Sequence, residues 1–347
     1  MKKICFLLLS VLLFGACSTT NIVTMTVVDP APVTLPASIK KVGIINRSNA
    51  IDKNNLINKI DQVLSGETKN LDKDGAKECI SGMQNELLSN KRFDEIKVLD
   101  QLDLRGPGMG IMPAPLSQDD VNKICRANDV DALFALESYD TNSKITTTSA
   151  PVNINTPLGG IPAIEFTATM RTEIKTGWRI YDPMASGIVD EYRFSDHLTF
   201  TGRGINPIIA AAGLIERKEA VNQVSNKAGH AYALRIVPFS VRVARDYYVR
   251  GTDNFEIATR KARTGNWDEA AELWKKETTN SDPKIAGRAY YNMAIINEIH
   301  GNLDLAVDWA QKSYENYNNP LALRYVNILK DRQVRNNILK QQEESEK

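Results

Sequence analysis

Hydrophobic and polar positions alternate along residues 39–249 with two periods, one typical of strands and one typical of helices. Short apolar runs bounded by turn residues predict strands, and apolar positions that recur every three or four residues predict helices. The expected strands are Lys41 to Asn46, Phe93 to Leu99, Ala132 to Tyr139, Phe166 to Tyr181, Ile188 to Phe194 and Phe239 to Val243. The expected helices are Lys53 to Leu64, Asp74 to Ser89, a short helix after Ser117, and Pro207 to Leu234.

The order of these elements predicts the fold class. Helices separate the early strands, and a meander and a long helix follow, which is typical of an α/β sandwich with one mixed sheet and helices on a face. Ser117 and Asp120 form a variant capping box, in which the serine hydroxyl is expected to accept the Asp120 backbone N–H and open the short helix. We therefore expect an α+β protein whose sandwich domain spans residues 39–249.

Two copies of one helical-hairpin pattern follow at residues 250–333. The run Gly265 to Ala270 (GNWDEA) recurs as Gly301 to Ala306 (GNLDLA), and 301 − 265 gives a period of 36 residues. This is close to the tetratricopeptide (TPR) length of about 34 residues. The glycines permit a sharp turn, and small residues let paired helices approach closely. The residues assigned to repeat packing are Ala258, Gly265, Ala270, Trp274, Ala294, Gly301 and Ala306. A generic pair of helical hairpins is the alternative.

The ends of the repeats follow from proline, which cannot continue a helix. Asp282-Pro283 and Asn319-Pro320 end the two units, and Leu321 to about Leu339 is expected to cap the stack. Residues 334–347 form a charged tail that is helical or frayed. Because two repeats are fewer than the roughly three needed for independent stability, we expect them to dock on the sandwich through Tyr247 and Tyr248.

Polar and aromatic residues on the inner faces of such helices are candidates for a binding surface. The candidates are Arg288, Tyr290, Tyr291, Asn297 and Arg324. For each of them a structural role is the alternative.

The first residues resemble an export signal. Lys2 and Lys3 precede an apolar run from Ile4 to Phe14, which suits a signal peptide over residues 1–16 and is shorter than the roughly 20 residues that span a bilayer. Phe14 to Cys17 (FGAC) resembles the lipobox of bacterial lipoproteins, although the family usually has leucine where Phe14 stands. The resemblance implies that Cys17 is diacylated and becomes the new N-terminus. An ordinary signal peptide is the alternative.

Residues 17–38 are rich in Pro, Val and Thr and are expected to form a lipidated tether or an edge strand. The neutral residues Ser18 to Asn21 lack the acidic signals that hold enterobacterial lipoproteins at the inner membrane or favour surface display. The resemblance therefore implies the cell outer membrane and a periplasm-facing orientation.

The composition indicates which classes of partner and ligand to expect. The 43 basic and 42 acidic residues nearly cancel, so no charge field favours nucleic acid. Cys79 and Cys125 each lie on the apolar side of a helical pattern and are expected to be small core residues, with pairing in an oxidising compartment as the alternative. The cysteines and histidines have no ligand spacing, so we expect no metal and no cofactor.

No pattern indicates catalysis. His197, His230 and His300 lie far from any nucleophile signature. Gly106 to Gly110 is not followed by a helix start, and Thr201 to Gly204 lacks the lysine of a phosphate loop. We therefore expect no catalytic residues and no enzymatic activity.

Several strand patterns resemble the core of the curli-secretion and penicillin-binding-protein-activator lipoproteins. The matching segments are Lys41 to Ile45, Phe93 to Leu99, Asp131 to Glu137, Trp178 to Pro183 and Ser186 to Val189. Val130-Asp131 stands in place of the family's Ala-Asp pair, and Ser186-Gly187 in place of its Thr-Gly turn. The whole architecture more closely resembles an uncharacterised family of Bacteroidota lipoproteins with C-terminal TPR repeats.

Together these features predict an outer-membrane-anchored lipoprotein that acts as a protein- or peptide-binding scaffold in the cell envelope. One alternative is a component of an export or assembly system resembling curli secretion. It would require alternating membrane strands of about ten residues, and Ile145 to Asn155 and Ala163 to Ile174 contain Pro151 or charges. A hydrolase with an unrecognised site is the other alternative.

Overall fold

The computed structural model describes residues 19–49 and 71–345, except residues 103, 109, 158 and 186. These residues divide into two compact units. The helical unit comprises the described residues up to Pro30 together with Phe239–Glu343, and the sheet unit comprises Ala31–Pro238 with the very end of the chain. The expected signal peptide, Cys17 and the helix expected at Lys53 to Leu64 lie outside the described residues.

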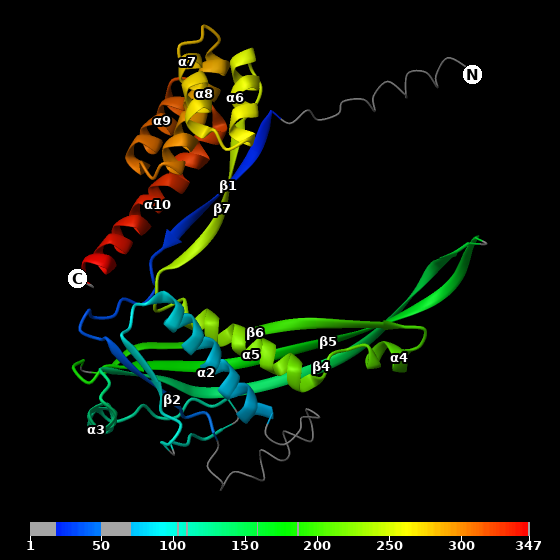
Figure 1. Cartoon of the computed structure of the whole chain (residues 1–347), viewed down its shortest axis with the longest axis vertical. Helices are drawn as coiled ribbons and strands as arrows, with labels where there is room; N and C mark the ends of the chain where they lie inside the picture. The colour runs from blue at the N-terminus through cyan, green and yellow to red at the C-terminus, as the bar shows by residue number, and fades with distance from the viewer. Residues whose placement is uncertain are drawn as a thin grey trace. The chain divides into compact units, whose positions relative to one another are not determined.

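The sheet unit is built on one five-stranded mixed sheet (Figure 1), as the sequence predicts. In spatial order its strands are β3 (Glu95–Val98), β2 (Lys41–Asn46), β4 (Ala132–Thr156), β5 (Gly159–Tyr181) and β6 (Ile188–Gly204). β2 runs parallel to β3 and β4, whereas β4, β5 and β6 are antiparallel neighbours. The α+β fold class is confirmed, and β2 has the bounds that its apolar run predicts.

Two helices cover one face of this sheet. α2 (Leu71–Asn90) and α5 (Arg217–Ala233) pack on the core side of β4 and β5 around Trp178. They cross closely because glycines lie at the contact: a Cβ on Gly229 would stand 1.7 Å from the Cys79 carbonyl oxygen, and one on Gly82 would stand 2.0 Å from that of Asn226. The helical pattern predicted for Asp74 to Ser89 is confirmed.

The opposite face carries α3 (Gln118–Asn128). Its first turn is capped as expected, because the Asp120 backbone N–H donates to Ser117 Oγ at 3.2 Å. Cys125 lies in the core beneath α3, whereas Cys79 lies in the core on the α2 side, and both thiols are free. The sheet separates them, so they are small core residues and not a disulfide. Burial raises the pKa of the Cys125 thiol to about 11.

β4 and β5 are much longer than their patterns predict. β6 pairs with β5 from Phe166 onward, and Phe166 pairs with Ser149 of β4, so residues 150–165 continue past β6 as a two-stranded arm (Figure 1). The prediction stopped β4 at Tyr139 because the apolar run ends there and a Thr- and Ser-rich stretch follows.

The helix predicted at Pro207 to Leu234 is broken into two. α4 (Pro207–Ala212) ends at Gly213, and α5 begins at Arg217. α4 lies against β6, where a Cβ on Gly202 would stand 2.3 Å from the Ala210 carbonyl oxygen. The chain therefore leaves α4 at a glycine and turns before α5 starts.

The helical unit begins with a two-stranded antiparallel ribbon. β1 (Thr20–Asp29) pairs with β7 (Phe239–Tyr248) along the full length of both strands. Of the two forms expected within residues 17–38, a tether or an edge strand, residues 20–29 take the strand. One expectation is corrected, because the strand expected to close the sandwich packs with the helices instead. A partner more than 200 residues away decides both outcomes.

Five helices complete the helical unit (Figure 1). They are α6 (Asp253–Arg263), α7 (Trp267–Glu277), α8 (Pro283–Ile299), α9 (Leu303–Glu315) and α10 (Pro320–Ser345). Pro283 and Pro320 lie in the first turn of the next helix. Proline suits this position because a backbone N–H there would have no partner within the helix. α10 continues through the tail that the sequence left as helical or frayed. None of the helices within the described ranges is long and apolar enough to cross a membrane.

The two helix-to-helix turns are built alike. Gly265 and Gly301 have φ values of +85° and +78°, which favour glycine. Each glycine N–H donates to the carbonyl three residues back, and each following asparagine N–H donates to the carbonyl five residues back. This shared bonding pattern is what the recurring GN pair specifies.

Candidate functional site

In the helical unit, strand β7 lies along helix α8. The contacts follow in order, from Arg250 with Arg288, through Tyr248 with Asn292, to Arg245 with Glu298. Five strand residues at about 3.4 Å each cover roughly 17 Å, and ten helical residues at about 1.5 Å each cover roughly 15 Å. The strand and the helix therefore cover nearly the same length between these contacts, and they run antiparallel to each other.

Asn292 holds the strand backbone as a neighbouring strand would. The Tyr248 N–H donates to Asn292 Oδ1 at 2.7 Å, and Asn292 Nδ2 donates to the Tyr248 carbonyl oxygen at 2.7 Å. The Asn292 side chain is fully buried. These two bonds satisfy both backbone groups of Tyr248, which would otherwise be costly to bury.

Glu298 holds the strand through a side chain. Its carboxylate accepts Arg245 Nε at 2.8 Å and Nη2 at 2.9 Å, Arg332 Nη1 at 3.1 Å, and the Tyr325 hydroxyl at 2.6 Å. Burial, followed by the negative charge of Glu298, raises the pKa of Tyr325 well above its usual value. The two-pronged Arg245 contact has the geometry of the strongest arginine–carboxylate pairs.

Most of the predicted binding residues serve this internal packing. Arg288 donates to the Arg250 carbonyl oxygen at 2.8 Å and lies over the Tyr248 ring. Tyr291 is buried between Tyr248 and Tyr325, and buried Asn297 donates to the Met293 carbonyl oxygen within its own helix. The side of α8 that the sequence suggested for a partner is therefore already occupied by β7.

The other two predicted residues remain at the surface. Arg324 is exposed on α10. Tyr290 is half-buried, and its ring lies 5.1 Å from that of Trp309 on α9 and 5.1 Å from that of Tyr317. We call Tyr290, Trp309 and Tyr317 the aromatic patch. Lys312 Nζ lies 5.8 Å from the Trp309 ring.

A glycine on α8 makes room for the aromatic patch. A Cβ on Gly287 would stand 2.7 Å from Tyr317 Cβ, so the absence of a side chain there admits Tyr317 against α8. The residues assigned to repeat packing occupy comparable places: Ala258, Ala270, Trp274, Ala294 and Ala306 are fully buried. Trp274 contacts Tyr247 of β7 and Trp267, so strand β7 also meets the first hairpin.

Sequence reasoning missed Asn292, Glu298, Trp309 and Tyr317. A signal existed for the first two, because both are polar residues among the apolar positions of α8. Trp309 and Tyr317 gave a weaker signal, since an aromatic residue on a helix is usually a core residue.

The sheet unit holds a second buried carboxylate. Glu137 lies at a β-bulge, where the register of β4 against β5 shifts between Leu136 and Ser138. Arg47 Nη1 donates to its two carboxylate oxygens at 3.0 and 2.7 Å, and the Tyr181 hydroxyl donates to it at 2.5 Å. Arg179 Nη1 lies 3.8 Å away. Glu137 follows Leu133 and Ala135 in alternation on the face that carries α3, and the bulge turns the next core residue, Tyr139, to the face that carries α2.

The Glu137 cluster fastens the segment Pro113–Leu116 to the end of the sheet. Arg179 Nη1 donates to the Pro113 carbonyl oxygen at 2.8 Å, and Arg47 Nη2 donates to that of Ala114 at 3.2 Å. The Leu116 N–H donates to the Tyr181 hydroxyl at 3.2 Å. Burial raises the pKa of Glu137, although Tyr181 and the arginines act in the opposite direction. The groups bond one another and the backbone, which indicates a latch for this segment.

Buried tyrosines predict how stability changes in alkali. Burial and Glu137 raise the pKa of Tyr181 to about 12, and burial also raises the pKa of Tyr232, Tyr248, Tyr291 and Tyr325. Such a group adds stability below its unfolded pKa of about 10, and the contribution is lost as pH rises through the folded value. Tyrosinate absorbance should therefore show these tyrosines ionising above the others, together with loss of structure. Simultaneous ionisation of all 11 tyrosines near pH 10 would contradict their burial.

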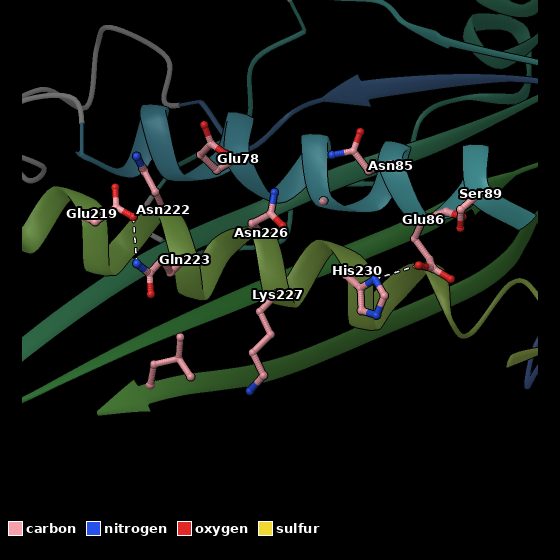
Figure 2. A pocket seen from close by; sticks show the side chains of 12 residues that line it. Glu78, Asn85, Glu86, Ser89, Glu219, Asn222, Gln223, Asn226, Lys227 and His230 are labelled. Carbon is pink, nitrogen blue, oxygen red and sulfur yellow. Dashed lines mark hydrogen bonds and ion pairs between the residues drawn. The ribbon is translucent and has the colours of Figure 1, made fainter. Parts of the chain in front are cut away.

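A polar hollow of about 730 Å³ lies between α2 and α5 (Figure 2). Several of its lining residues pair with their neighbours: His230 Nδ1 lies 2.9 Å from Glu86, and Lys227 Nζ lies 2.9 Å from Asp196. Gln223 donates to Glu219 at 2.8 Å. These pairs indicate a solvated polar groove along the line where α2 and α5 cross.

The other chemistry-bearing residues are dispersed. His197 is exposed on β6, and His300 Nε2 lies 2.9 Å from Asp268 at the end of α8. Within the part of the chain that the structure describes, no three His, Cys, Asp or Glu side chains are grouped to hold a metal ion.

Two family models match the chain. Domain of unknown function (DUF8603) matches residues 39–248, and Domain of unknown function (DUF6340) matches residues 256–331. A comparison with curated proteins gives no match. Among solved structures, the crystal structure of a neuraminyllactose-binding hemagglutinin homolog from Helicobacter pylori is similar over 70% of this chain and 94% of that chain. Its sequence identity is 8% and its TM-score is 0.23, so it supports no statement about function.

Proposed function

Since the chain belongs through residues 39–248 to the family described as Domain of unknown function (DUF8603), we propose a function from its geometry: a lipid-anchored scaffold that binds a protein partner in the cell envelope. The anchor is Cys17, and the protein faces the periplasm from the outer membrane. Binding takes place on the aromatic patch of the helical unit and involves no catalysis.

The observation that carries this proposal is the aromatic patch beside a filled inner face. β7 occupies the side of α8 that carries Asn292, so a partner must use another surface of the repeats. The patch offers three half-buried aromatic rings, with those of Trp309 and Tyr317 each 5.1 Å from that of Tyr290, and a lysine beside Trp309. Tyrosine and tryptophan are enriched at the energetic centres of protein interfaces, which supports a protein partner.

The anchor would lie close to the helical unit. β1 begins at Thr20, three residues after Cys17, and these residues span at most about 11 Å. Because β1 is paired with β7, a lipid on Cys17 would hold the helical repeats near the membrane surface. This arrangement replaces the long tether suggested by composition.

Photo-crosslinking in intact cells tests the partner site. A crosslinking amino acid at Lys312, beside Trp309, is expected to capture one protein, and the same group at exposed Arg260 on α6 should not. Trp309→Ala should reduce capture from position 312 at least about tenfold, as expected for an interface anchor. Capture that is equal at both positions, or unchanged by Trp309→Ala, would contradict the patch.

The anchor is tested separately. Mass spectrometry of the native protein should find fatty acid on Cys17, and Cys17→Ser should move most of the protein out of the membrane fraction. A native chain without fatty acid would refute the anchor while leaving the patch to be judged by crosslinking.

A further inference from the structure

The far end of the sheet unit carries exposed isoleucines and few charges. Residues 150–164 of the β4–β5 arm contain no charged residue, and neither do residues 204–215 around α4. Ile205 and Ile208 are 75% and 80% exposed, and Ile154, Ile161 and Ile164 are between 50% and 58% exposed. Isolated exposed apolar residues are ordinary, but a gathering of this kind marks an interaction surface.

The two faces of the arm differ. Ile154 and Ile161 are cross-strand partners, so their side chains share one face. Ile164 lies opposite Pro151 and, by the two-residue period of a strand, projects from the other face, where α4 also packs. Asn153 and Asn155 share the face of Ile164, so near the tip the apolar face is the one that carries Ile154 and Ile161. No charged residue lies beside that face.

The edges of the arm are blunted against strand pairing. Pro151 on β4 and Pro162 on β5 have no backbone N–H to offer an added strand. This disfavours a second copy or an extended peptide that would lengthen the sheet along the arm. The faces of the arm are therefore its binding surface.

We propose that the tip of the β4–β5 arm inserts into the interface region of a lipid bilayer. From Phe166 to Gly159 the arm extends about 24 Å beyond the end of β6. Interfacial elements are buried by only about 5–10 Å, so the residue pairs nearest the tip, including Ile154 with Ile161, suffice. At that depth water still reaches the backbone groups of the open edges, which hydrocarbon could not satisfy.

The inference rests on the proposed function only because the lipid on Cys17 keeps a bilayer within reach. The arm then supplies a second, weaker membrane contact from the sheet unit. Two weak contacts on one chain bind more firmly than either alone, because the second becomes intramolecular.

Vesicle co-sedimentation tests the arm without the lipid. The chain from residue 17 onward, with Cys17→Ser, is mixed with vesicles of phosphatidylethanolamine and phosphatidylglycerol in equal parts. We expect it to sediment with them, and Ile154→Asn with Ile161→Asn to weaken partitioning about tenfold for each isoleucine. The matched control, Ile257→Asn with Leu305→Asn in the helical unit, should bind like the parent chain. These isoleucines are exposed, and circular dichroism verifies that each variant is folded.

An Ile161→Trp variant gives a second measurement, since its emission should shift to shorter wavelength when vesicles are added. A parent chain that stays in solution, a double variant that sediments unchanged, or an arm-dependent dimer without vesicles would overturn the proposal. Because this chain carries no fatty acid, failure here is distinct from the absence of lipid on native Cys17, which would refute the anchor alone.

Discussion

Replacing Glu298 with glutamine is expected to lower the free energy of unfolding of the helical unit by about 3–5 kcal/mol, the usual cost of removing one partner from a buried ion pair. Arg245 and Arg332 would lose their carboxylate, and the Tyr325 hydroxyl would lose an anionic acceptor. Urea unfolding followed by tryptophan fluorescence measures the change, because three of the four tryptophans lie in this unit.

The matched control is Asp331→Asn on α10. Asp331 pairs with Arg335 at 2.8 Å, but both side chains are about half exposed, so the loss should stay below about 1 kcal/mol. Similar losses for Glu298→Gln and Asp331→Asn would show that Glu298 is not the buried centre of the helical unit.

Glu137→Gln is expected to destabilise the sheet unit by a similar amount, about 3–5 kcal/mol. The change leaves Arg47 and Arg179 without a buried carboxylate, and these arginines hold the Pro113 and Ala114 carbonyls. We therefore also expect backbone amides near Leu116, which bonds to Tyr181, to exchange hydrogen faster. Chemical denaturation and hydrogen exchange measure the two effects.

Glu165→Gln in the same sheet is the control for Glu137. Glu165 lies 3.7 Å from exposed Arg203, so its loss should change stability by less than about 1 kcal/mol. If Glu137→Gln leaves the exchange near Leu116 unchanged, the latch is not what holds this segment.

The elements that local pattern could predict are those whose burial is local. β2 is a continuous apolar run and is found with its predicted bounds, and α2 and α3 follow their helical periods and the Ser117 cap. The repeated Gly-Asn turns likewise carry their geometry in the residues themselves. In these places one stretch of sequence contains the whole physical reason for the structure.

Other elements depend on pairing between residues far apart in the sequence. The pattern of residues 20–29 suited a tether or an edge strand equally, and only β7 makes it a strand. β7 itself appeared to close the sandwich, and the DUF8603 match also ends at Tyr248, yet its contacts lie with the helices. No local signal distinguishes these assignments, because an alternating strand packs on any apolar surface.

The buried carboxylates show the same limit for side chains. Glu137 meets Arg47 from 90 positions away, and Glu298 meets Arg245 from 53 positions away. In the sequence each is one of 42 acidic residues without a motif. Among the predicted binding residues, Tyr291 and Asn297 lie buried, and the sequence could not show this because an aromatic or amide side chain suits a groove and a buried contact equally well.

Hydrogen exchange at the Tyr248 amide tests most directly whether β7 fills the inner face of the helical repeats. This amide donates to buried Asn292, so it should exchange as slowly as the core amides of α8, and Asn292→Ala should accelerate its exchange while the α8 amides stay slow. Rapid exchange at Tyr248 in the unaltered protein would mean that the inner face is open, and the reason for assigning partner binding to the aromatic patch would be lost.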